Sequence, residues 1–240
     1  MLAIDPHYKL TSFTKARSGK GSEVGRPRVL SRERIRDAAL MIIDRGGLGE
    51  LSMRRLAAEL GVQAASLYKH YPTKDDVLDD VASQIISAVD ISAFDADEDW
   101  PDALAKWARS YRAALVSHPN LVPFLASGPG QREEGLRIAD GVHGGLMRAG
   151  WPPRESTLIG EATRSLVLGS TFGSFSRSLV DDAEAYRGKY PHMGQAHLLR
   201  SKASEIDSAS FELALTAFVD GLRTQFTEVT ERRKRRPADV

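Results

Sequence analysis

The sequence contains no cysteine and no long apolar run. The absence of cysteine excludes disulfide frameworks, thiolate nucleophiles, iron–sulfur clusters and cysteine-ligated zinc, and it favours a reducing compartment. No stretch of about 18 consecutive apolar residues occurs, and the first residues lack the apolar segment of a secretory signal. We therefore expect a cytoplasmic protein that does not cross a membrane.

Catalytic motifs are also missing. The sequence has no G-x-S-x-G, no Walker loop and no H-E-x-x-H. Gly128, Gly130 and Gly135 imitate part of a phosphate-binding loop, but no strand precedes them. His192 and His197 lie in a segment with the composition of a loop, where solvated histidines are commoner than metal ligands. We expect neither enzymatic activity, nor a cofactor, nor a metal site.

Signals for β-structure are absent, because no hairpin sequence and no run of alternating polar and apolar residues appears. The 240 residues, 42% hydrophobic and 27% charged, are enough for one or two globular domains. Apolar residues recur instead at helical spacing throughout the chain, as between Leu104 and Leu115. The fold class predicted is all-α.

Charge is distributed unevenly along the chain. Residues 1–75 contain 14 Lys and Arg against 8 Asp and Glu, a net charge of +6, whereas the remaining 165 residues contain 19 and 24, a net charge of −5. A basic segment beside an acidic body suggests an anionic partner, of which nucleic acid is the commonest, and a solvated terminus is the alternative. Residues 1–30 are predicted to be a disordered basic arm, and residues 231–240 a solvated basic tail.

Four helices are predicted in the first part of the chain. Ser31 is a good N-cap for the first, which Gly46 and Gly47 end, and Ser52 caps the second, which Gly61 follows. The third is short and lies within residues 63–71, because Pro72 disfavours a helical residue before it. The fourth begins at Thr73, with Asp76 placed for a capping box.

The second and third of these helices have the layout of a helix-turn-helix, in which the second helix of the pair enters the major groove of DNA. The side chains expected to face outward are short or polar and leave room for that entry: Gln63, Ala64, Ala65, Ser66, Lys69 and His70. Gln63 is suited to adenine, the alanine methyls to thymine methyls, and Ser66 to a base or a phosphate.

Further DNA contacts are expected from residues around this surface. Arg54, in the first turn of the second helix, is the best candidate for a bidentate guanine contact, and Ser52 is placed beside it. Tyr68, Lys69, His70 and Lys74 are predicted to bind phosphate, with Lys74 aided by the amide dipoles at the start of the fourth helix.

At these residues the sequence closely resembles the TetR family of bacterial transcriptional regulators. The resemblance covers residues 25 to about 85 and rests on GRPR, SRERIRDAALMIIDRGG and LGVQAASLYKHYPTKDDVL, in which Val77 stands where Leu is commoner. The remainder resembles the subgroup built like the Tet repressor itself. The resemblance implies a DNA-binding domain at residues 31–76, an effector-binding and dimerisation domain at residues 77–230, and a homodimer joined through residues 153–180 and 209–226.

Between these regions the periodicity predicts a helix opened by Trp100 and Pro101, a short helix at 119–126 and another at about 131–149. A long buried helix is predicted at 153–180, a loop at 182–208 and a last helix marked by Phe211 to Leu222.

The resemblance also implies a ligand pocket beneath the DNA-binding heads. Aromatic residues of the acidic body are together the candidates for lining it, although any one of them, taken singly, is more simply explained as part of the core: Trp107, Tyr111, Phe124, Phe172 and Phe175. The tetracycline-binding members use two histidines and an asparagine, and alignment puts Asp90, Trp107 and Phe124 at those places. This departure argues against magnesium–tetracycline and favours an apolar or aromatic effector.

The function expected is that of a transcriptional regulator, most simply a repressor, that binds a palindromic operator as a dimer and is released by a small ligand. The alternative is an architectural DNA-binding protein without an effector, which would use the arm and the basic cluster at residues 232–236 as electrostatic clamps.

Overall fold

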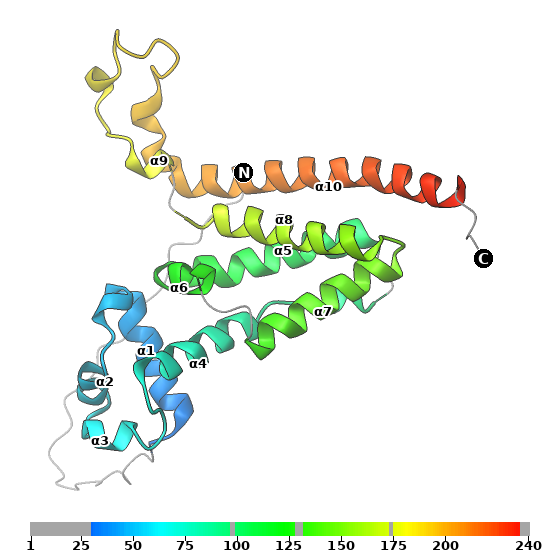
Figure 1. Cartoon of the computed structure of the whole chain (residues 1–240). Helices are drawn as coiled ribbons and strands as arrows, with labels where there is room; N and C mark the ends of the chain where they lie inside the picture. Colours follow the sequence, from blue (N-terminus) through cyan, green and yellow to red (C-terminus); the bar gives the residue numbers. More distant parts are fainter. Residues whose placement is uncertain (1–29, 97–98, 128–131, 173–174, 236–240) are drawn as a thin grey trace, which may run out of the picture. The chain divides into compact units, whose positions relative to one another are not determined.

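The computed structural model describes residues 30–96, 99–127, 132–172 and 175–235, and within these ranges it contains helices and no strand (Figure 1). Residues 31–240 form one compact unit, to which the following description applies. The predicted arm at residues 1–30 lies outside the described residues apart from Leu30. The α-helices are α1 (Arg32–Gly46), α2 (Met53–Leu60), α3 (Ala64–Leu67), α4 (Lys74–Ser87), α5 (Trp100–Ser117), α6 (Val122–Ser127), α7 (Glu133–Arg148), α8 (Pro153–Gly169), α9 (Phe175–Ser178) and α10 (Ala203–Arg235).

The boundaries of α1 and α2 follow from their caps. The Ser31 hydroxyl accepts a hydrogen bond from the Arg34 amide, and the Ser52 hydroxyl accepts one from the Arg55 amide at 3.2 Å. Gly61 ends α2 in the left-handed region, with φ of 66°, a conformation that costs glycine little. The predicted helix starts and turns are confirmed here.

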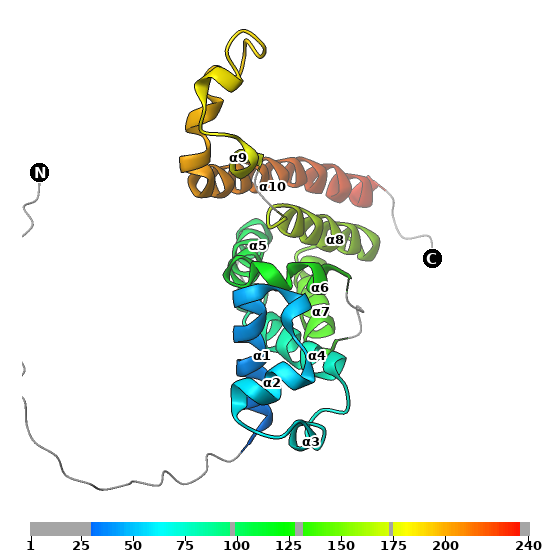
Figure 2. The same cartoon turned by 90° about the vertical axis from the view of Figure 1, so that its left-hand side faces the viewer.

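The capping box predicted for α4 is present. The Asp76 amide donates to Thr73 Oγ1 at 3.1 Å, and the Thr73 amide donates back to the Asp76 carboxylate at 2.8 Å. The buried face of α4 carries Val77, Leu78, Val81, Ala82, Ile85 and Ile86. This face packs against α1 at one end and α7 at the other, so α4 joins the first three helices to the rest of the unit (Figure 2).

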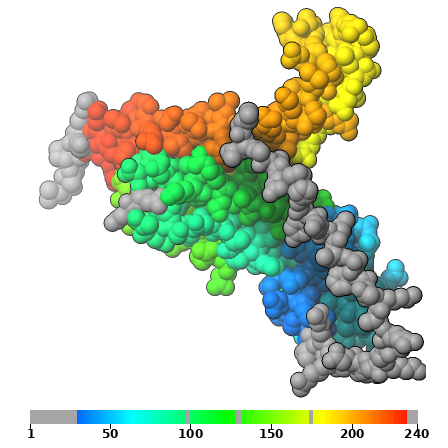
Figure 3. All heavy atoms as spheres, turned by 180° about the vertical axis from the view of Figure 1, so that it is seen from behind, coloured from blue at the N-terminus to red at the C-terminus, as the bar shows by residue number. Residues whose placement is uncertain are grey.

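Helices α5, α7 and α8 pack on one another, and α10 lies along α5 and α8. Figure 3 shows α10 as an orange-to-red ridge beside the green helices. Arg109 on α5 pairs with Glu212 on α10 through Nη2 at 2.8 Å. Helix α7 packs closely on the 3₁₀ turn Ser92–Phe94, which lies between α4 and α5. This packing depends on Gly145, because a Cβ there would lie 2.5 Å from a ring carbon of Phe94.

The long buried helix predicted at 153–180 is wrong in its extent, because α8 ends at Gly169 and a separate short helix, α9, follows. Ser170 and Thr171 donate hydrogen bonds from their hydroxyls to the carbonyls of Val167 and Leu168, both at 2.7 Å. These bonds satisfy the last carbonyls of α8, and glycine, serine and threonine favour a helix less than the residues before them. Only one face of α8 is buried.

The segment predicted as a loop at 182–208 contains three 3₁₀ turns, at Ala183–Ala185, Ala196–Leu198 and Arg200–Lys202. It has a small apolar cluster of its own, made by Leu179, Tyr186 and Ala196 with Met193 and Leu199 packed against them. Too few apolar residues are involved to give a helical period, which is why the sequence predicted only a loop.

The last helix is longer than predicted at both ends, since α10 begins at Ala203 and reaches Arg235. Residues 231–235 of the predicted tail are therefore helical, and residues 236–240 lie outside the described part of the chain. Glutamate and arginine are good helix formers. Arg233 also donates to the Gly150 carbonyl at 3.0 Å, and Phe226 packs on the rings of Trp100 and Trp151. No helix within the described residues is both long and apolar enough to span a bilayer.

Candidate nucleic-acid interface and ligand cavity

The predicted DNA-reading surface is carried by α3 and the turn that follows it. Leu67 and Tyr71 are fully buried and anchor this segment. The residues predicted to contact DNA between and around them are exposed or half-buried: Ser52, Arg54, Gln63, Ala64, Ala65, Ser66, Tyr68, Lys69, His70 and Lys74. The structure therefore leaves all ten side chains at least partly accessible to a partner, and their contacts with DNA stay predictions.

Arg54 and Arg55 differ in their surroundings although they are adjacent on α2. Arg55 forms an ion pair with Glu50, whereas Arg54 makes no ion pair with any residue that the structure describes. A guanidinium already paired with a carboxylate must give up that partner before it binds a base, and an unpaired one need not. Arg54 is thus the better placed of the two to contact DNA.

Tyr71 fixes the end of the reading segment, which we define as residues 63–71, to α1 and α4. The Tyr71 hydroxyl donates to Oδ2 of Asp80, and the hydroxyl oxygen also lies 3.3 Å from the Arg32 carbonyl oxygen. The Arg32 guanidinium lies 4.4 Å from the centre of the Tyr71 ring. Nη1 of Arg36 lies 3.8 Å from Oδ1 of Asp80. Burial, together with the hydrogen bond to Asp80, raises the pKa of Tyr71 to about 12.

The end of α1 is held by residues that follow α5. The His118 Nδ1 atom lies 3.0 Å from the Asp44 carboxylate, and the Asn120 amide donates to the carbonyls of Ile43 and Asp44 at 3.0 and 3.1 Å. These are two of the last carbonyls of a helix, which have no partner within the helix itself. The sequence analysis missed this connection, because side-chain capping by a residue 76 positions away leaves no local pattern.

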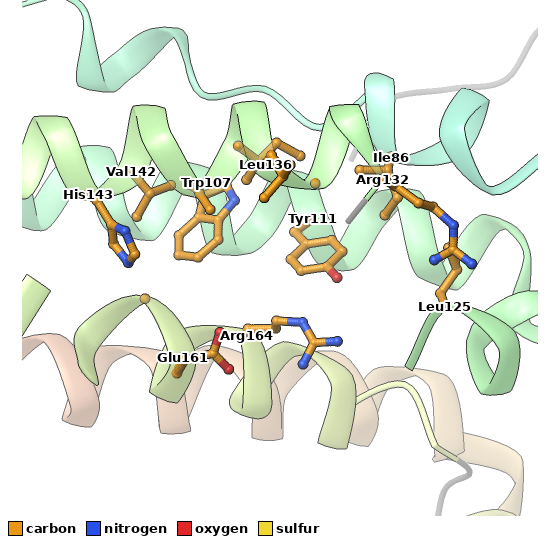
Figure 4. Close-up of a pocket in the computed structure, with 14 residues that line it drawn as sticks. Ile86, Trp107, Tyr111, Leu125, Arg132, Leu136, Val142, His143, Glu161 and Arg164 are labelled. Atoms are coloured by element: carbon orange, nitrogen blue, oxygen red, sulfur yellow. The ribbon is translucent and has the colours of Figure 1, made fainter. Parts of the chain in front are cut away.

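A cavity of about 400 Å³ lies among α4, α5, α6, α7 and α8, a size suited to a small organic ligand (Figure 4). Trp107 and Tyr111 form one wall, with ring centres 6.3 Å apart and planes at 20°. The remaining lining side chains are Ile86, Leu125, Arg132, Leu136, Ile138, Ala139, Val142, His143, Glu161 and Arg164, together with Gly135 and Gly160.

Of the five aromatic residues predicted to line a pocket, the structure places Trp107 and Tyr111 at this cavity. Phe124 is not part of the lining, and the guanidinium of the lining residue Arg132 lies 4.8 Å from its ring centre. Phe172 is 51% exposed and is not part of the lining. The side chain of Phe175 lies outside what the structure describes. Ligand binding by any of the five stays a prediction.

Asp90, one of the three residues expected at the places of the family's tetracycline-binding side chains, has a local structural role. Its carboxylate accepts a hydrogen bond from the Ser92 amide at 2.8 Å, and its own amide donates to the Ser110 hydroxyl at 2.8 Å. The hydrogen bonds from Ser92 lower the pKa of the Asp90 carboxyl. Asp90 is not among the residues that line the cavity.

The polar side chains of the cavity were not identified from the sequence. Arg132, His143, Glu161 and Arg164 all line the cavity, but charged and polar residues of a helix usually meet solvent, so nothing in their sequence positions indicated a cavity. Figure 4 shows the Tyr111 hydroxyl on the same side of the cavity as the guanidinium groups of Arg132 and Arg164. Burial raises the pKa of Tyr111, and the nearby Arg164 partly opposes that rise.

Comparison with known protein families gives two matches. Residues 35–81 match the family of bacterial regulatory proteins described as the tetR family, and residues 94–226 match the tetracyclin repressor-like C-terminal domain. The first match covers the candidate reading surface, and the second covers most of the cavity lining.

Curated relatives resemble the chain over different lengths. An HTH-type transcriptional regulator of Saccharopolyspora erythraea is 31% identical over 59% of this chain and 60% of its own length. The transcriptional repressor DrrR1 of Streptomyces coeruleorubidus is 36% identical over 47% of this chain and 42% of its own length. The match therefore spans less than two thirds of either protein. The class A tetracycline repressor of Escherichia coli is 30% identical over 77% of this chain and 87% of its own length.

Solved structures show the same fold. A possible TetR family regulator of Streptomyces coelicolor is 30% identical, with a TM-score of 0.65, over 81% of this chain and 99% of that one. The S. coelicolor TetR family protein ActR in complex with actinorhodin is 25% identical, with a TM-score of 0.63, over 82% of this chain and 99% of that one. Both likenesses extend over the first three helices, α1 to α3, which we call the head, and over the remaining helices, which we call the body.

Proposed function

The chain belongs to the tetR family of bacterial regulatory proteins, and on that premise we propose that it represses transcription by binding a palindromic operator as a homodimer and releasing it when a small ligand occupies the cavity. The family consists of transcriptional regulators and not of enzymes. Two relatives are named as repressors, which supports repression as the mode of action.

The observation that carries the proposal is the contrast within the reading segment. Leu67 and Tyr71 are fully buried, while short or polar side chains between Gln63 and His70 remain accessible. A surface that is to enter the major groove needs small side chains on a backbone that does not yield on contact. The Tyr71–Asp80 hydrogen bond supplies that rigidity from α4.

A homodimer is supported by apolar side chains left exposed on α8 and α10, the helices that the family resemblance assigns to the interface. Leu213 is 74% exposed and Leu158 is 51% exposed, although both lie on well-formed helices. Gly169 has open space where a Cβ would stand. Burial of such side chains against a second copy removes apolar surface from water.

Ligand control is supported by the cavity and its position. The cavity is lined by α4, whose first turn follows the reading segment directly, and by four further helices. A ligand that favours one placement of α4 changes the spacing of the two reading segments in a dimer. A coupling free energy of about 1–3 kcal/mol between ligand binding and DNA binding is enough to release much of the protein from its operator. The structure of ActR in complex with actinorhodin supports control by a small ligand.

The test is a comparison of two duplexes, one enriched by selection from a random pool and one scrambled. A regulator prefers the selected duplex by at least about a thousandfold at moderate salt. Binding that falls steeply with salt and shows little preference between the two would establish the architectural alternative and reject the proposal.

A further inference from the structure

Arg132 connects the cavity to α4. It stands at the N-cap of α7, and its guanidinium lines the cavity. The Arg132 Nε and Nη2 atoms lie 3.0 and 2.9 Å from the same oxygen of Asp79, in the middle of α4. Arg132 is therefore the cavity residue that holds α4 by a charged contact.

The two partners in this ion pair are exposed to different degrees. The Arg132 side chain is 11% exposed, whereas the Asp79 side chain is 50% exposed. The centre of the Phe124 ring lies 4.8 Å from the same guanidinium and gives it a cation–π contact. Since a buried cation needs a charged partner and a half-exposed carboxylate can be hydrated instead, Asp79 is the partner that leaves at little cost if another anion arrives.

The guanidinium also has unused hydrogen-bonding capacity. Although Nη2 lies 2.9 Å from an Asp79 oxygen, this contact does not have the geometry of a hydrogen bond, and the buried nitrogen has no hydrogen-bond partner among the described residues. Arg164 lines the same cavity and makes no ion pair within the described part of the chain, although Glu161 precedes it by one helical turn. Two guanidiniums thus face the cavity on the side where the Tyr111 hydroxyl lies (Figure 4).

Asp79 is adjacent to Asp80, which accepts the hydrogen bond from Tyr71 at the end of the reading segment. On consecutive residues of one helix, α4 is therefore fastened to the cavity through Asp79 and to the reading segment through Asp80. Loss of the first contact removes one restraint on α4, and a shift of α4 would move the Asp80 carboxylate that holds Tyr71.

We propose that the effector is a planar aromatic acid whose carboxylate or phenolate takes the Arg132 guanidinium away from Asp79, with Arg164 as the second cation and the Trp107–Tyr111 wall as the surface for the ring system. The inference rests on the function proposed above. It names both the chemical class of the ligand and the contact whose exchange transmits its binding.

The test uses anthracene-2-carboxylate and its uncharged counterpart, anthracene-2-carboxamide, with the full chain. Tryptophan fluorescence measures the binding of each probe, and anisotropy of a labelled duplex enriched by selection measures DNA binding. We expect the carboxylate to bind and to weaken DNA binding roughly 5- to 150-fold, and the carboxamide to change it by less than about twofold.

Two variants locate the exchange. In Asp79→Asn the carboxylate probe has no competitor for Arg132, so it binds about tenfold more tightly and its effect on DNA binding shrinks by about the same factor. In Arg132→Gln the discrimination between carboxylate and carboxamide is reduced. Asp140→Asn removes an equal charge from an exposed position on α7 and leaves both probe affinities unchanged.

The inference is overturned if the carboxamide binds as tightly as the carboxylate, if neither probe binds at about 1 mM, or if Asp79→Asn leaves the probe affinity as in the unaltered chain. These outcomes are read from fluorescence alone. They are therefore distinct from failure of the proposed function, in which no duplex is enriched at all.

Discussion

The imidazole of His118 lies 3.0 Å from the carboxylate of Asp44, and the contact joins the residues that follow α5 to the C-terminal turn of α1. Asn120, two residues later, donates to two carbonyls of that same turn. The three-helix head is thus held to the body at two places, through this contact and through α4.

Replacement of Asn120 by alanine tests the first of these places. Asn120→Ala removes the side-chain donor to the Asp44 carbonyl and one of the donors to the Ile43 carbonyl, which also accepts from the Gly47 amide at 2.7 Å. We expect a loss of about 1–3 kcal/mol in the free energy of unfolding, since each of the two lost hydrogen bonds contributes about 0.5–1.5 kcal/mol. Urea unfolding followed by circular dichroism measures it. Asn120→Asp keeps the size but not the donor and should lose at least as much; a fully stable Asn120→Asp would contradict the explanation.

Replacement of Tyr71 by phenylalanine tests the second place. The hydrogen bond to the Asp80 carboxylate is lost, which we expect to cost about 1.5–3 kcal/mol of stability at neutral pH. Operator affinity should fall as well, because the reading segment loses its support. An unchanged unfolding midpoint would show that Tyr71 contributes only its ring.

The pKa of Tyr71 makes its contribution depend on pH at the alkaline end. The pKa is raised from 10.0 to about 12 in the folded protein, so the phenol ionises first in the unfolded chain. The stabilising effect is complete below about pH 10 and is lost as the pH rises to about 12. Unfolding free energies measured across this interval should fall more steeply for the unaltered chain than for Tyr71→Phe, and parallel curves would contradict the assignment.

Adjacent arginines on α2 provide a matched pair for DNA recognition. Arg54→Ala should cost about 1–3 kcal/mol in operator binding and relax the preference at one base position in each half-site. Arg55→Ala, which removes the partner of Glu50, should change binding less. Equal weakening on every sequence by Arg54→Ala would instead make Arg54 a phosphate contact.

The exposed leucine on α10 tests the homodimer. Leu213→Arg places a charge where we expect a second copy to pack, and light scattering at micromolar concentration should find a monomer with weakened operator binding. Met41→Arg is the control, because Met41 is also an exposed apolar residue but lies on α1, among the first three helices. A Leu213→Arg chain that stays dimeric would place the interface elsewhere.

Helix boundaries were predictable where a cap or a turn residue marks them, as at Ser31, Ser52, Gly61 and Thr73. The end of α8 and the start of α10 were not, because hydroxyl side chains there bond to carbonyls and the segment between them folds around a small cluster. The DNA-reading surface depends on local sequence and could be proposed in full. The polar part of the cavity could not be predicted, because Arg132 and Arg164 come to line a cavity only when α7 and α8 pack against α5.

The most direct test of the account is selection of bound duplexes from a random pool, followed by sequencing. We predict enrichment of a site with two-fold symmetry whose half-sites are centred about one helical turn apart, or a multiple of it, roughly 34–36 Å per turn. A pool that remains random, or that yields a single half-site without symmetry, would contradict the claim that two copies of the α3 surface read DNA together.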